Sequence, residues 1–291
     1  MFLSVVMLAA GLRLAAQTPV VGIDYNKTTY IAPAYFGPNC FQVPYMLDGR
    51  GSNDLKVELA GDYIYGRTGS KDDTYDIYLR VQVPLFTDRV SLNVWWAVHE
   101  WYSMSPDVLA FRRVPPGTKG RGNAAGPIFV STDILVMRET ERRPGLSLRA
   151  AMRTAAEDNA YENARGYDAP GYFFDLAAGK SWGGFRLSAS VGFLCWQTDY
   201  GRQNDAVMFG LQAAYTHQYF DLSAHYGAYW GWERAGDFPN TLRLRCDVGD
   251  AAKWYVRPYV EYQHGFKDWP FDLFRVGVSY SLDLVSRMKN R

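Results

Sequence analysis

Apolar and polar residues alternate along most of the chain after residue 54. Successive side chains of a β-strand point to opposite faces of a sheet, so period-two alternation predicts strands. Helical periodicity is absent from these stretches. We expect twelve strands, over residues 55–65, 74–83, 90–102, 127–139, 145–156, 171–181, 185–197, 205–218, 220–232, 240–248, 254–264 and 272–284.

The connections between these segments alternate in length. The short ones are residues 84–89, 140–144, 183–184, 219 and 249–253, and the longer, more polar ones are residues 103–126, 157–170, 198–204, 233–239 and 265–271. An even strand count with alternately short and long loops is typical of outer-membrane barrels. The expected fold class is therefore all-β, a transmembrane antiparallel up-and-down β-barrel with short periplasmic turns and longer extracellular loops.

The position of charge within each segment favours a membrane barrel over a soluble sheet. When the more apolar register of each segment is taken as outward, the central outward positions carry no Asp, Glu, Lys or Arg. Lys or Arg at the bilayer midplane costs about 2–4 kcal/mol, which explains this exclusion. The inward register holds the charges, at Lys56, Glu58, Asp62, Asp76, Arg80, Asp133, Arg149, Arg153, Asp175, Arg186, Arg243, Arg245, Asp247, Arg257, Glu261, Arg275 and Asp283.

Aromatic residues are abundant, with 9 Trp, 21 Tyr and 16 Phe in 291 residues. Aromatic rings gather at membrane–water boundaries, so two belts are expected. At the long-loop ends of the segments we expect Tyr63, Tyr65, Tyr75, Trp101, Tyr102, Trp196, Trp230, Trp232 and Trp269. At the short-turn ends we expect Phe86, Trp182, Phe185, Tyr219, Phe220, Trp254 and Tyr255.

The first residues differ in character from the barrel segments. Residues 1–12 are an apolar run too short to span a bilayer, and Ala15, Ala16 and Gln17 suit a cleavage site, although the basic residues that usually open a signal peptide are missing. We therefore expect a signal peptide at 1–17 and a periplasmic or plug-like segment at 18–54. The barrel is expected at 55–284 and a C-terminal tail at 285–291. No window is apolar for long enough to predict a membrane-spanning helix.

Charge and cysteine content narrow the chemistry. The net charge of +1 gives no electrostatic reason to expect nucleic acid as a partner. The chain has three cysteines, Cys40, Cys195 and Cys246, which is an odd number, and no two of them have C-x-x-C spacing. Neither a disulfide framework nor a zinc site is therefore predicted. No cofactor or metal site is expected. The expected partners are outer-membrane lipid and a small polar solute, and the oligomeric state is left open.

Several stretches resemble an uncharacterised family of outer-membrane barrel proteins from Bacteroides-type bacteria. They are Ile31-Ala-Pro-Ala-Tyr-Phe-Gly-Pro-Asn39, Val43-Pro44, Asp48-Gly-Arg50, Ser131-Thr-Asp-Ile-Leu135, the run from Gly192 to Ala206 and Lys267-Asp-Trp-Pro-Phe271. The similarity covers nearly the whole chain after the expected signal peptide. It implies the fold and an outer-membrane location, and it carries no activity or site residues.

A small porin-like channel for passive diffusion of small polar or charged solutes is the first hypothesis for function. Twelve strands enclose a lumen wider than that of eight-stranded barrels. Glu58, Asp62 and Asp76 come from the wall of the barrel opposite Arg149, Arg153 and Arg186. Such opposed charges would orient a solute in the lumen. An equally weighted alternative is that the inward charges form internal ion pairs that only satisfy a closed lumen. The expected solute pathway comprises Glu58, Asp62, Asp76, Arg80, Arg149, Arg153, Arg186, Arg243, Arg245, Arg257, Glu261 and Arg275. Either the loop 103–126 or the segment 18–54 is long enough to constrict it.

Two other hypotheses remain. A lipid hydrolase needs a nucleophile, a base and an orienting group. We place His99 and His225 inward, His217 at a short-turn end, and His264 on the lipid side where Asn240 could approach it, with no serine beside them. The enzyme hypothesis is therefore the weakest. A non-conducting barrel could instead act as a structural protein or bind a ligand, best at the loop 197–205.

One proline interrupts this pattern. Pro258 has no backbone N–H and lies within a predicted strand, so we expect a bulge or a register change there.

Overall fold

The computed structural model describes residues 33–114, 117–155, 165, 170–197, 205–232 and 237–289. Thirteen strands form one antiparallel sheet. They are β1 (Asp54–Gly66), β2 (Asp72–Pro84), β3 (Val90–Met104), β4 (Arg121–Ala124), β5 (Phe129–Met137), β6 (Gly145–Arg153), β7 (Gly171–Trp182), β8 (Phe185–Trp196), β9 (Ala206–His217), β10 (Phe220–Trp230), β11 (Asn240–Val248), β12 (Val256–Gly265) and β13 (Phe271–Asp283).

The sheet closes on itself because β1 pairs with both β2 and β13. The 4-residue strand β4 pairs only with the outer end of β3, beyond the part of β3 that pairs with β5. The other twelve strands form the ring, as the alternation predicts, and each predicted boundary lies within three residues of the observed one. The fold class predicted from the sequence is confirmed.

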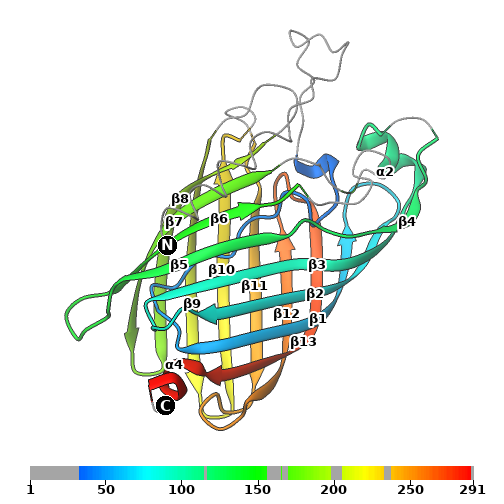
Figure 1. Ribbon diagram of the computed structural model, residues 1–291. Coiled ribbons are helices and arrows are strands. Elements are labelled where there is room, and N and C mark those ends of the chain that lie inside the picture. Colours follow the sequence, from blue (N-terminus) through cyan, green and yellow to red (C-terminus); the bar gives the residue numbers. More distant parts are fainter. Residues whose placement is uncertain are drawn as a thin grey trace.

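The two ends of the barrel differ. The 3-10 helix η2 (Pro33–Tyr35) and helix α2 (Pro106–Phe111) lie at the end with the long loops, and helix α4 (Leu284–Lys289) lies at the end with the short turns (Figure 1). In the part of the chain that the structure describes, no helix is both long and apolar enough to cross a membrane.

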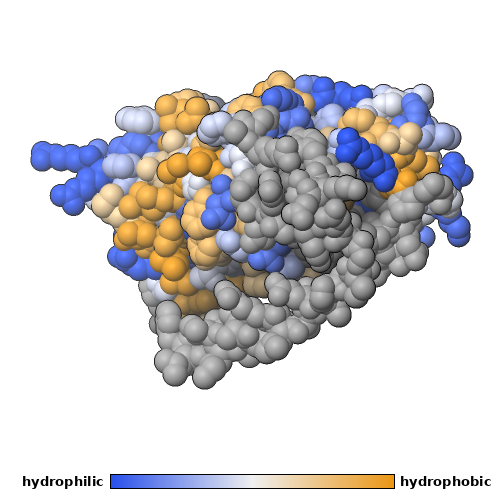
Figure 2. All heavy atoms as spheres, turned by 90° about the horizontal axis from the view of Figure 1, so that it is seen from above, coloured by the Kyte–Doolittle hydropathy of each residue, from blue (hydrophilic) through white to orange (hydrophobic). Residues whose placement is uncertain are grey.

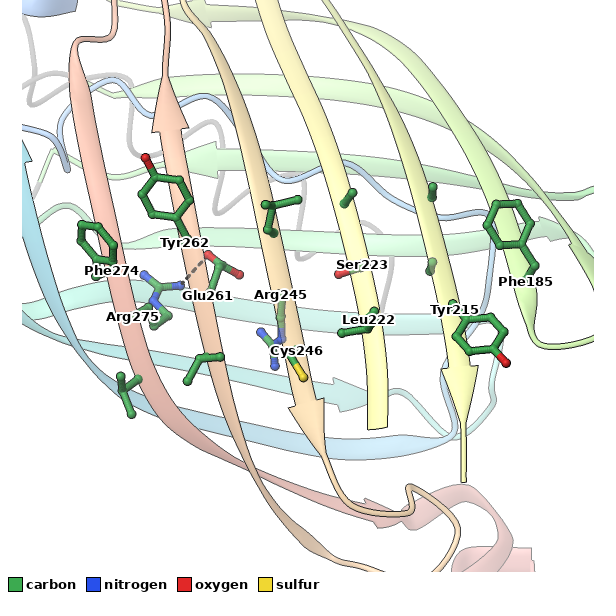
Figure 3. Close-up of a pocket in the computed structure, with 16 residues that line it drawn as sticks. Phe185, Tyr215, Leu222, Ser223, Arg245, Cys246, Glu261, Tyr262, Phe274 and Arg275 are labelled. Carbon is green, nitrogen blue, oxygen red and sulfur yellow. Dashed lines mark ion pairs between the residues drawn. The ribbon is translucent and has the colours of Figure 1, made fainter. Parts of the chain in front are cut away.

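The outer wall is apolar, as a lipid environment requires. Large aliphatic side chains such as Leu187, Leu211 and Val276 stand exposed on it, and Figure 2 shows apolar side chains gathered on this wall. Outward charged residues such as Asp73 and Asp272 lie close to strand ends. Over β9–β12 the wall has an apolar hollow of about 710 Å³, bordered by Phe185, Tyr215, Tyr262 and Phe274 (Figure 3).

A β-bulge in β3 overturns one sequence prediction. Ile77 pairs with His99 and Tyr78 with Ala97, so Val98 is an extra residue. An extra residue reverses which face the following side chains occupy. His99 therefore points outward with Ile77 and contacts the exposed Trp101, which corrects its inward assignment. The same bulge turns Glu100 inward, where it is buried.

The irregularity expected at Pro258 is absent. The β12–β13 register runs through Pro258 and Val278 without a shift, and the β11–β12 ladder begins at Tyr259, one residue later. The missing N–H of Pro258 thus removes no bond from the β11–β12 ladder. Register shifts occur instead in β2–β3 and in β5–β6, where Val136 is the extra residue.

The aromatic belts are present, with some corrected members. Tyr65, Tyr75, Trp101 and Trp230 are exposed at the long-loop end, and Phe86, Trp182, Phe185, Tyr219, Trp254 and Tyr255 are exposed at the short-turn end. Four rings assigned to the outer belt are instead buried, namely Tyr102, Trp196, Trp232 and Trp269. Tyr102 and Trp196 are buried because they lie on the inward faces of β3 and β8, and Trp232 and Trp269 lie outside the strands, after β10 and before β13.

Candidate lumen site

All twelve residues of the predicted solute pathway face the interior of the barrel. Arg80 and Arg245 are half-buried, and the other ten are buried, namely Glu58, Asp62, Asp76, Arg149, Arg153, Arg186, Arg243, Arg257, Glu261 and Arg275. Their place follows from strand periodicity, because they share a face with Ala60, Ala151 and Ala177, which are also buried.

Most of the lumen charges form ion pairs, several of them between neighbouring strands. Arg275 binds Asp62 through two hydrogen bonds of 2.7 and 2.6 Å, and Arg149 binds Asp175 through two of 2.7 and 3.0 Å. Figure 3 shows Arg275 of β13 also directed at Glu261 of β12, at 3.9 Å. The remaining pairs include Arg245 with Glu58 at 2.8 Å, Arg186 with Glu139 at 2.6 Å and Arg257 with Asp221 at 2.7 Å. These contacts favour the alternative of local ion pairs over that of two opposed charged walls.

The chain before β1 lies across the lumen. We call residues 39–50 the lumen segment; it descends from η2 at the long-loop end to the start of β1 at the short-turn end (Figure 1). Its apolar residues Cys40, Phe41 and Val43 are almost completely buried. Phe41 packs against the rings of Trp196 and Trp232, with ring centres 6.2 and 4.8 Å away. These contacts explain why the two tryptophans are buried.

Main-chain carbonyl groups of the lumen segment accept hydrogen bonds from the barrel wall. Arg243 donates to the carbonyl oxygens of Val43 (2.5 Å) and Pro44 (3.5 Å). Arg149 donates to Tyr45 O and Arg186 to Asp48 O, each at 2.5 Å. Tyr229 donates to Phe41 O at 3.2 Å. Four strands, β6, β8, β10 and β11, thus hold the backbone of one extended segment.

Tyr45 is the polar centre of the lumen segment. Its hydroxyl group donates to Glu261 and accepts from Arg275 at 3.3 Å, while the Arg243 guanidinium lies 4.0 Å from its ring centre. His225 is inward, as predicted, and accepts the N–H of Met46 at 3.2 Å. A guanidinium over an aromatic face is a favourable cation–π contact.

The outer mouth is covered by a second buried cluster. Arg112, just after α2, binds Asp72 at 2.6 Å, and Arg165 binds Glu100 at 3.0 Å, with all four side chains at most 3% exposed. Asn39 of the lumen segment donates to Glu100 at 2.8 Å and to Asp76 at 2.9 Å. Arg112 thus holds the chain after α2 against β2, and Asn39 holds the lumen segment against β2 and β3. Residues 198–204 of the predicted ligand loop lie outside the described residues.

A polar cavity remains between the lumen segment and the short-turn end. Its volume is about 480 Å³. Charged residues from both the wall and the turns line it, among them Arg80, Arg89, Asp133, Arg245 and Asp247. This part of the lumen is not filled by side chains.

The histidine assigned to a lipid hydrolase has different partners from those expected. His264 faces outward, and its Nδ1 lies 2.5 Å from Asp272 and 3.4 Å from the Tyr262 hydroxyl. Asn240 instead donates to the carbonyl of Phe238 at 2.7 Å. In the described ranges no cluster of His, Cys, Asp and Glu is arranged to hold a metal ion.

Some residues of the site are not predicted by the sequence pattern. Arg112, Arg165 and Glu100 carry the cluster at the mouth, yet two lie in loops and the third follows the bulge. The lumen segment is predicted only as a stretch without alternation. Its burial does have a signal in the sequence, because residues 40–47 are mostly apolar or aromatic although they do not alternate as a strand does.

Comparison with known proteins supports the fold. No family model matches the sequence, and no curated protein matches it. The COG4313 outer membrane channel from Pseudomonas putida F1 is similar in structure, with a TM-score of 0.56 and 12% identity over 83% of this chain and 98% of that chain. The KdgM porin in complex with disordered oligogalacturonate and the NanC porin are more distant, each with a TM-score of 0.48 and 9% identity over 78% of this chain and 99% and 100% of theirs.

The similarity to the COG4313 channel shows the fold, a β-barrel of the outer-membrane type, and together with the apolar outer wall it locates the protein in the outer membrane. The resemblance to a Bacteroides-type family stays a prediction.

Proposed function

We propose that this protein is an outer-membrane channel for small polar or charged solutes, and that the lumen segment closes it in the conformation described. The observation that carries the proposal is the polar cavity of about 480 Å³ beneath the segment. A barrel with only a structural role gains more from an apolar, tightly packed interior than from buried charges beside open space. A charged, partly empty lumen instead suits the passage of hydrated solutes.

The lumen segment is held differently from the wall. The wall is a continuous ladder of backbone hydrogen bonds around the whole ring. The segment is held by one aromatic anchor, Phe41, by hydrogen bonds to its carbonyl groups, and by the side chains of Asn39 and Tyr45. It can therefore leave the lumen while the barrel stays intact. The solute pathway would then follow the twelve inward residues.

Single-channel recording in planar bilayers tests this proposal. Phe41→Ala removes the anchor, and loss of a buried Phe side chain costs about 3–5 kcal/mol. A loss of that size shifts the population of the displaced segment by roughly two to four orders of magnitude. We expect rare, brief openings for the natural protein and long openings for Phe41→Ala.

Phe174→Ala is the matched control, because Phe174 lies on the lipid face and is 39% exposed. It should behave like the natural protein. If natural protein and Phe41→Ala are both silent, although both migrate as folded barrels before heating, the channel proposal is wrong and a non-conducting barrel is the better explanation.

A further inference from the structure

We propose that the lumen segment occupies the binding site of a linear oligoanion, with Arg243 at its centre, and that such a ligand displaces the segment. This inference rests on the proposed channel function and deepens it, because it assigns both a ligand class and a mode of opening. In the absence of ligand, the segment would occupy the ligand's binding site.

Arg243 carries the argument. Its side chain is buried, yet none of the described residues places a carboxylate oxygen within 4.0 Å of it. Its partners are the carbonyl groups of Val43 and Pro44, Gln263 and the ring of His225. The Arg243 guanidinium has exchanged its hydration for neutral acceptors, and the Glu261 carboxylate acts on it only from beyond ion-pair distance. A carboxylate would therefore bind Arg243 more strongly than the carbonyl groups do.

Other arginines extend this site along the lumen. Arg149 and Arg186 each have a carboxylate partner, but each also gives an N–H group to the segment, at Tyr45 O and Asp48 O. In an extended chain, acceptors two and three residues apart are separated by roughly 7 and 10 Å. A linear molecule with anionic groups on that scale could occupy the same donors.

The cavity below provides a continuation. Arg80 lines it and contacts Asn93 at 3.4 Å, and among the described residues it too has no carboxylate oxygen within 4.0 Å. A ligand that replaced the segment at Arg243 would meet a second cation closer to the short-turn end, one that Glu58 and Asp133 approach without forming an ion pair. The charge pattern therefore favours an oligomer over a single small anion.

Displacement has a concentration requirement. The segment is tethered beside its own site, where its effective concentration is on the order of millimolar. A ligand must outcompete this tethered chain, so binding and opening are coupled. The channel would remain closed in dilute solute and open when the oligoanion is abundant.

Cys40 provides a natural reporter for this coupling. It is fully buried in the closed lumen, and the variant Cys195→Ser/Cys246→Ser leaves it as the single thiol. The experiment measures the rate at which a bulky maleimide modifies Cys40 in the folded barrel. The probe is tetra-L-glutamate, and tetra-L-glutamine is the uncharged control of the same length.

We expect tetra-L-glutamate to raise the modification rate about tenfold and tetra-L-glutamine to leave it unchanged. In the same background, Arg243→Gln should raise the rate without ligand, because the segment loses its donor, and should reduce the further increase caused by tetra-L-glutamate. A purely structural role of Arg243 would predict only the first change. Arg138→Gln is the control, because Arg138 pairs with Asp88, is 54% exposed and is not one of the twelve residues of the solute pathway.

Two failures can be told apart. If Phe41→Ala conducts but tetra-L-glutamate leaves Cys40 protected, or acts no differently from tetra-L-glutamine, the oligoanion site is wrong and the channel survives. If tetra-L-glutamate exposes Cys40 but no variant conducts, the binding site stands and the channel function fails.

Discussion

The ion pair between Asp62 and Arg275 joins β1 to β13, where the sheet closes into a barrel. Two hydrogen bonds of 2.7 and 2.6 Å link the side chains, which are 1% and 6% exposed. Asp76 lies opposite Asp62 on the other side of β1. Substitution Arg275→Gln therefore leaves two neighbouring inward carboxylates without their nearest cation. Removal of one partner of a buried pair costs about 3–5 kcal/mol, and we expect a loss of this size in the free energy of unfolding.

The complementary substitution should cost less. Asp62→Asn leaves Arg275 with the Tyr45 hydroxyl at 3.3 Å and Glu261 at 3.9 Å. We expect a loss of about 1–3 kcal/mol for a hydrogen bond to a charged group. In the double variant neither charge is left unpaired, so its loss should be smaller than the sum of the single losses by about 2 kcal/mol.

Urea unfolding in detergent micelles, followed by tryptophan fluorescence and by gel mobility before heating, measures these differences. The control is Arg138→Gln, because Arg138 is 54% exposed in its pair with Asp88 and such pairs contribute about 0–1 kcal/mol. If Arg275→Gln costs no more than the control, or if the double variant is simply additive, the lumen charges are not stabilised by local pairing.

Two further predictions concern local structure. Deletion of Val98 removes the extra residue of β3 and leaves Glu100 inward opposite Asp76, so we expect the deletion variant to reach the folded gel mobility. Deletion of Val94, which pairs with Val81 and Val130, should instead shift the register, turn inward residues toward lipid and prevent folding; the opposite result for the two deletions would contradict the bulged pairing of β2 with β3. In the β5–β6 turn, burial would raise the pKa of Glu139, but Arg186, the N–H of Ser181 and Lys180 outweigh it and lower that pKa to about 2. A carboxyl group whose pKa is lowered by folding stabilises the protein at pH values above its unfolded pKa of about 4.3, and this stabilisation is lost as the pH falls from about 4.3 toward 2. The melting temperature should therefore fall between these pH values, and it should fall less in Glu139→Gln.

The strands were predictable because each is specified by its own alternation. Membrane exclusion of charge fixes which face of a strand points outward, and residues such as Glu58 and Arg149 follow directly from that rule. A bulge breaks the rule without a sequence mark. Val98 is apolar like Trp96 and Ala97 before it, so alternation alone placed His99 on the wrong face.

The lumen segment shows a different limit. Its contacts with the wall are made largely through main-chain carbonyl groups, which every residue carries, so no residue type between 39 and 50 specifies Arg243 or Arg149 as a partner. The contacts also join residues far apart in the sequence. A lack of alternation shows that the segment is not a strand of the barrel, and its path through the lumen requires the structure.

A reversible lock on the lumen segment tests the central claim most directly. A Cβ atom added at Gly227 of β10 would lie 3.2 Å from Cγ1 of Val43, which suits a disulfide between Val43→Cys and Gly227→Cys. The pair would be introduced with Phe41→Ala after the three natural cysteines are replaced by serine. Single-channel recording should show closed barrels when the bond is oxidised and long openings after reduction. Equal conductance in the two states would contradict the claim that this segment closes the channel.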